Sequence, residues 1–77
     1  MARFVFVLRH GDVDSATRCF QLARVAHSKN HTVNLFFVDD GVLWADSSRD
    51  FSAKSATGDC PNDYFPYLVQ KEVPVGV

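Results

Sequence analysis

Three apolar segments separated by longer stretches constrain the fold of this chain more than any other feature. Residues 3–8 are almost entirely β-branched or aromatic and show no polar alternation, which predicts a parallel strand covered on both faces. Residues 32–38 and 73–77 are further strands of the buried type. A helix-like stretch joins the first two strands, so their order indicates a βαβ unit with a parallel sheet. The chemistry of such sheets lies just beyond the carboxyl ends of the strands.

The connecting helix is predicted over residues 15–29, where apolar side chains recur at helical spacing. Asn30 is suited to a left-handed stop after it, and basic residues near its end suit the helix dipole. The residues that can cap its start are Asp12, Asp14 and Ser15.

The second half of the chain is less regular. Residues 42–45 are predicted to form either a short helix or an apolar patch folded over the sheet. Residues 46–59 are small and polar without a usable period, which predicts a long mobile loop. A second helix is predicted over residues 63–71, with Pro66 in its first turn. The candidates for its N-cap are Asn62 and Asp63.

Length and charge limit the chain to one domain, residues 1–77, and exclude several classes of function. A chain of 77 residues buries only ~60% of its unfolded surface, so we expect a thin stability margin. Its net charge of −1, with both signs interspersed, gives no electrostatic footprint for nucleic acid or an anionic membrane. No apolar run approaches the ~20 residues that a bilayer requires. The first residues lack the pattern of a signal peptide, so we expect a cytoplasmic protein.

The tripeptide Arg9-His10-Gly11 follows the first strand and is the sharpest local motif. Histidine phosphatases carry this tripeptide in the same context, with the histidine taking the phosphoryl group and the arginine holding its oxygens. The rest of that machinery has no evident counterpart in this sequence. The alternative, which we favour, is a strand-to-helix turn in which Gly11 permits a tight backbone.

Paired carboxylates follow the second strand at Asp39-Asp40-Gly41. They could bind a hard cation, but one loop with two adjacent aspartates supplies too few ligands. We therefore expect one of them to cap the next turn, or both to lie at a pocket rim. The two histidines His27 and His31 have no obvious third ligand, so we expect no metal and no zinc site.

The two cysteines differ in their predicted surroundings. Cys19 lies on the apolar stripe of the first helix, where burial disfavours the thiolate, so we interpret it as structural. Cys60 lies in the predicted loop just before a helix start, where exposure and the helix dipole favour reaction. The nearby Asp59 and Asp63 oppose that effect. Both cysteines are predicted to be free thiols, because two are too few for a disulfide framework.

Several of these segments, taken in order, resemble the small sulfur-relay proteins of the DsrE, DsrF and TusD type. The resemblance covers nearly the whole chain, and it depends on order and spacing more than on any single piece. The segments that carry it are Phe4-Val5-Phe6-Val7-Leu8 with His10-Gly11, Ala16-Thr17-Arg18, Phe37-Val38-Asp39-Asp40-Gly41-Val42, and Pro61-Asn62-Asp63-Tyr64-Phe65-Pro66-Tyr67-Leu68 with Val73-Pro74-Val75.

The resemblance implies a flavodoxin-like, three-layer α/β subunit with a parallel sheet, of which this chain supplies the βαβ(α)β portion. It further implies a cytoplasmic homo-oligomer, a trimer or hexamer, or a hetero-oligomer, with no metal or organic cofactor. In active members a cysteine at the end of the strand that matches residues 73–77 carries a persulfide. That cysteine would fall immediately after Val77, so we expect the domain to be incomplete at its C-terminus. Glu72 stands where relatives often turn with glycine.

Three functions follow as hypotheses. The first is a sulfur-relay subunit, a persulfide carrier of the sulfurtransferase type in intracellular sulfur oxidation or tRNA thiolation, whose partners are other sulfur-relay proteins. The second is a catalytically inert structural subunit of a DsrE-type oligomer, and the third is a histidine phosphatase that uses His10. For the relay, Cys60 is a weak candidate for an auxiliary thiol. The predicted pocket rim consists of His10, Gly11, Asp39, Asp40 and Gly41.

Overall fold

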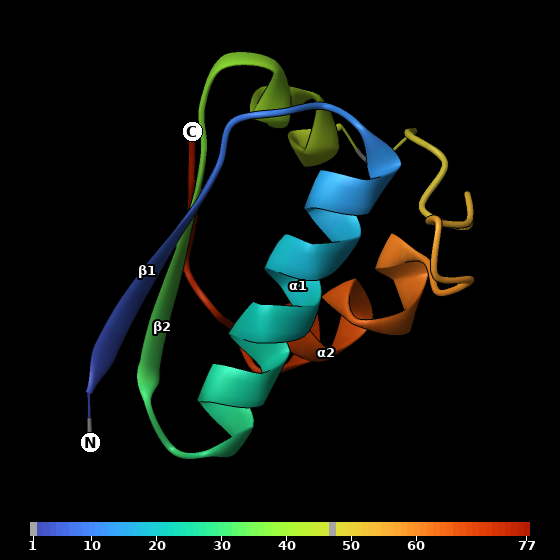
Figure 1. Cartoon of the computed structure of the whole chain (residues 1–77). Coiled ribbons are helices and arrows are strands. Elements are labelled where there is room, and N and C mark those ends of the chain that lie inside the picture. Colours follow the sequence, from blue (N-terminus) through green and yellow to red (C-terminus); the bar gives the residue numbers. More distant parts are fainter. Residues whose placement is uncertain (1, 47) are drawn as a thin grey trace.

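A computed structural model describes residues 2–46 and 48–77 of the chain. Its elements alternate between strands and helices, as the sequence predicts (Figure 1). In chain order they are strand β1 (Arg3–Leu8), helix α1 (Val13–Ser28), strand β2 (Thr32–Phe37), 3-10 helix η1 (Asp39–Ala45), 3-10 helix η2 (Pro61–Asp63), helix α2 (Phe65–Gln70) and strand β3 (Val75–Gly76).

The three strands form one parallel sheet in the order β1-β2-β3, with β2 in the centre. Leu8 at the end of β1 pairs with Phe37 at the end of β2, and Leu35 pairs with Val75 of β3. The carboxyl ends of β1 and β2 therefore lie side by side. The prediction of a parallel α/β fold of the flavodoxin-like βαβ type is confirmed. Both helices lie on the same face of this sheet in the described part of the chain (Figure 1).

The core lies between that sheet face and α1. Phe20 of α1 is fully buried, with its ring centroid 4.7 Å from that of Phe65 and 6.1 Å from that of Phe37. Burying an aromatic side chain of this size contributes about 1.5–3 kcal/mol to folding. The buried apolar residues packed together here are Leu8, Ala16, Phe20, Ala23, Val33, Leu35, Phe37, Trp44, Leu68 and Val73.

The opposite face of the sheet is open within the described residues. Val5 and Val7 alternate with the core residues of β1, and their exposed fractions are 53% and 54%. Phe36 of β2 also remains exposed, with its ring against the backbone of Gly76. The prediction that the first strand is covered on both faces is therefore wrong for this part of the chain, because both helices pack on one side.

The ends of α1 follow from local chemistry. The carboxylate of Asp12 accepts a hydrogen bond from the Ser15 backbone N–H at 2.9 Å, so the helix begins at Val13, two residues before the predicted start. After the helix, Asn30 adopts a φ of 68°, which confirms the left-handed stop. Glu72 has a φ of 57° in the turn after α2, a conformation that favours glycine.

The second half of the chain departs most from the sequence predictions. The apolar segment at 42–45 belongs to η1, which starts at Asp39 and buries Trp44. The predicted second helix is divided into η2 and α2, and Pro66 lies in the first turn of α2 as expected. The third strand is short, because only Val75 and Gly76 pair with β2. Within the stretch 46–59, predicted as a mobile loop, Ala56, Thr57 and Asp59 make contacts with α1 that are described below.

Candidate functional site

The loops after β1 and β2 meet at the carboxyl edge of the sheet because two glycines allow a close backbone approach. The Val38 N–H donates to the carbonyl of Leu8 at 3.0 Å, which extends the pairing beyond the strands. A Cβ atom on Gly41 would lie 1.9 Å from that same carbonyl oxygen, so only glycine fits there. A Cβ atom on Gly11 would lie 3.1 Å from the carbonyl oxygen of Asp40. These two predicted rim residues therefore act through their backbone.

Trp44 and Arg49 also hold in place the loop that contains Gly11. The Trp44 indole N–H donates to the Gly11 carbonyl at 3.1 Å, and the Arg49 guanidinium donates to the same oxygen. The guanidinium also lies over the indole ring, 4.4 Å from its centroid. Sequence reasoning missed both residues. The single tryptophan of the chain, next to the Asp39-Asp40-Gly41 motif, was the available signal.

The polar side chains predicted for the rim are exposed and loosely arranged. The Arg9 guanidinium donates to the Asp39 carboxylate at 3.3 Å, with about two thirds of each side chain exposed. A pair this exposed contributes little to stability. His10 and Asp40 are exposed as well. These residues therefore lie at the same carboxyl edge of the sheet, but their side chains do not meet at one position.

A cavity of about 460 Å³ lies beside this edge, between β1 and α1. His10 is the one predicted rim residue that lines it, whereas Gly11, Asp39, Asp40 and Gly41 do not. The residues that line the cavity are Val7, Leu8, Arg9, His10, Asp14, Ser15, Arg18 and Cys19. Its lining therefore combines two arginines and a histidine with one carboxylate and one thiol.

Neither cysteine has the surroundings of a ready nucleophile. Burial raises the pKa of the Cys19 thiol to about 11, so it stays protonated at neutral pH, in agreement with its structural interpretation. Cys60 has an exposed fraction of only 6%. Its carbonyl accepts from the Asp63 backbone N–H at 3.0 Å, and its own N–H donates to the Asp63 carboxylate at 3.0 Å. The expectation that Cys60 is exposed is wrong, because this small exposed fraction makes it one of the buried residues.

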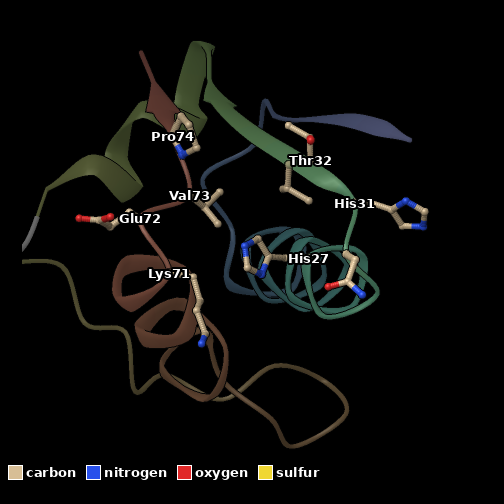
Figure 2. Close-up of a pocket in the computed structure, with 9 residues that line it drawn as sticks. His27, His31, Thr32, Lys71, Glu72, Val73 and Pro74 are labelled. Carbon is tan, nitrogen blue, oxygen red and sulfur yellow. The ribbon is translucent and has the colours of Figure 1, made fainter. Parts of the chain in front are cut away.

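The other two histidines lie at the opposite end of the sheet, around a cavity of about 350 Å³ (Figure 2). His27 bonds to the Tyr67 hydroxyl through Nδ1 at 2.9 Å, and the Nδ1 of His31 accepts from the Ala2 backbone N–H at 3.0 Å. Figure 2 shows His27 directed toward Val73 and His31 directed away from it. Neither histidine is placed to join His10 in phosphoryl transfer.

The described residues contain no group of three or more histidine, cysteine or acidic side chains that could hold a metal ion. They also contain no helix with the length and apolar character needed to cross a bilayer.

The sequence matches the model of the DsrE/DsrF-like family over residues 2–77. The chain belongs to this family. Comparison with curated proteins and with solved structures gave no significant match. Membership in the DsrE/DsrF-like family confirms the resemblance stated above and places the chain among sulfur-relay proteins at the coarse level.

Proposed function

We infer that this protein is a cytoplasmic sulfur-relay subunit that carries sulfur as a protein persulfide. The observation that carries the inference is the match to the DsrE/DsrF-like family over residues 2–77. In this role it would serve intracellular sulfur oxidation or tRNA thiolation. Other sulfur-relay proteins would donate the sulfur to it and accept the sulfur from it. Free thiols, as in this chain, fit a reducing compartment.

The chemistry of the relay is thiol exchange. A cysteine thiolate attacks the outer sulfur of a donor persulfide, a new S–S bond forms, and the donor leaves as a thiolate. The position proposed for this cysteine directly follows Val77. Because β3 is parallel to β2, that position would lie at the carboxyl edge of the sheet, where the loops carrying His10 and Asp39 also lie (Figure 1).

Intact mass measurement after incubation with a persulfide donor tests the inference on the full-length protein. We expect a mass gain of one sulfur atom that is lost on reduction. Cys19→Ser and Cys60→Ser variants should both retain the gain, since partial burial raises the pKa of the Cys19 thiol to about 11 and Cys60 is buried. Loss of the gain in the Cys60→Ser variant alone would assign the carrier role to Cys60. Absence of any sulfur uptake would overturn the inference.

The second candidate is a catalytically inert structural subunit of a DsrE-type oligomer. It is favoured by the burial of Cys60 and by the open apolar sheet face around Val5, Val7 and Phe36, which an oligomer partner would cover. Native mass spectrometry that shows a stable trimer, hexamer or hetero-oligomer with no sulfur uptake would establish this function. A phosphatase that uses His10 gains no support, because His27 and His31 lie at the opposite end of the sheet and cannot act with it. A phosphoester assay that compares the His10→Ala variant with the unsubstituted protein tests it.

A further inference from the structure

Residues 52–60 form a strap that lies along the N-terminal half of α1, on the side away from the sheet (Figure 1). The strap closes at its base, where the Asn62 N–H donates to the carbonyl of Phe51 at 2.8 Å. Polar contacts join it to α1, and one of them is the hydrogen bond that the Arg18 guanidinium donates to the Thr57 hydroxyl at 3.0 Å. The Ala56 N–H donates to the Asp14 carboxylate at 2.8 Å, and Asp59 pairs with Arg18.

The Asp59 carboxylate is the centre of the strap's hydrogen bonds. One terminal nitrogen of Arg18 lies 2.6 Å from both of its oxygens, with side-chain exposed fractions of 41% for the arginine and 20% for the aspartate. The hydroxyl groups of Ser55, Thr57 and Tyr64 donate to the same carboxylate. These hydroxyls, Ser55 first, hold the pKa of Asp59 well below its usual range, so the carboxylate is charged at neutral pH.

Cys60 directly follows Asp59, and its thiol is buried although Thr57 and Gly58 in the same strap are exposed. The polar contacts of Asp59 therefore hold in place the backbone next to Cys60. Polar contacts at a surface open at lower free energy than an apolar core. The aromatic cluster of Phe20, Phe51 and Phe65, by contrast, lies outside the strap and anchors its base.

We propose that the contact between Arg18 and Asp59 is a latch that controls access to Cys60. When the latch opens, the strap lifts as a unit while the sheet and α1 remain folded, and the thiol becomes accessible to thiol-directed reagents. The latch makes Cys60 conditionally reactive, in contrast to Cys19, whose cover is the packing of α1 itself. This conclusion does not depend on the relay function.

Alkylation rates of the two cysteines test the latch on the full-length protein. Iodoacetamide is added, the thiolate displaces iodide, and peptide mass spectrometry follows Cys19 and Cys60 separately. In both Arg18→Gln and Asp59→Asn we expect Cys60 to react on the order of tenfold faster, with Cys19 unchanged. The two substitutions remove charges of opposite sign, so their direct effects on thiolate formation oppose each other. Opening of the strap accelerates Cys60 in both variants and leaves Cys19 slow.

Asp50→Asn is the matched control, because the Asp50 carboxylate accepts hydrogen bonds from the backbone N–H and the hydroxyl of Ser52 in its own turn, away from the contact between Arg18 and Asp59. It should leave both rates unchanged. The proposal is overturned if Cys60 stays slow in either latch variant. It is also overturned if Cys19 and Cys60 accelerate by the same factor, which would mean that the whole chain unfolds.

A second measurement requires no substitution. In the unmodified protein, low concentrations of urea should change the alkylation rate of Cys60 only weakly, because the strap exposes little surface on opening. A dependence as steep as that of global unfolding would contradict the latch.

Discussion

Glu72 shows how a single residue can occupy a conformation that its side chain disfavours. It follows α2 with a φ of 57°, and its N–H donates to the carbonyl of Val69 at 3.1 Å. The next N–H, of Val73, donates to the carbonyl of Leu68 at 3.0 Å. This pairing ends the helix with a left-handed residue, a position normally taken by glycine. A glycine at this position would adopt the same φ without a steric cost.

We expect Glu72→Gly to raise the free energy of unfolding by about 0.5–1 kcal/mol, because it removes the left-handed strain. Urea unfolding of the full-length protein measures the change. Lys71→Gly is the matched control, since Lys71 has an ordinary φ of −85°, and it should lower stability by about 0.5–1 kcal/mol. If both variants are less stable than the unsubstituted protein, the claim that the backbone at Glu72 is strained is wrong.

At the scale of elements, helix α1 is the part of the molecule that local sequence defines most completely. Its apolar stripe, its N-cap Asp12 and its left-handed stop Asn30 are all visible in the sequence and present in the structure. The shorter elements differ. η1 forms because Trp44 is buried against Gly11 and Phe20, and the start of η2 is fixed by Cys60 and Asp63.

The N-cap of α1 makes a pH-dependent contribution to stability. The backbone N–H of Ser15 lowers the pKa of Asp12, so the cap stabilises the fold above the unfolded pKa of about 3.9 and is lost as pH falls through the lower folded value. We expect Asp12→Ala to cost about 1 kcal/mol at pH 7 and progressively less below about pH 4. Thermal unfolding at several pH values measures this. Asp12→Asn, which keeps a capping oxygen, should cost less at pH 7. A cost of Asp12→Ala that stays constant down to pH 2 would exclude the cap.

At the scale of the whole molecule, the described chain covers only one face of its sheet. Leu8 and Val7 are neighbours on β1, yet Leu8 is buried under α1 and Val7 is 54% exposed on the open face. A substitution at each position therefore reports whether that face stays open in the protein in solution.

We expect Leu8→Ala to cost about 2–5 kcal/mol, because it removes buried core volume. Val7→Ala should change the free energy of unfolding by only about 0.5–1 kcal/mol. Urea unfolding at several protein concentrations measures both. A cost for Val7→Ala as large as that for Leu8→Ala would show that further chain or a second subunit covers the open face.

The sequence by itself determined the class of this fold. Apolar strands such as 3–8 and the stripe on 15–29 are local patterns with fixed periods, so β1, α1 and β2 could be predicted with their order and parallel direction. The glycines at 11 and 41 could likewise be predicted to lie at the meeting point of two loops.

Only the tertiary structure decided how the remaining residues are covered. Cys60 is buried and Val7 is exposed, the reverse of what their sequence neighbourhoods indicated. The physical reason is that burial depends on contacts between distant segments. Arg18 meets Asp59 across 41 positions, and Trp44 meets Gly11 across 33, and no local period encodes either pairing.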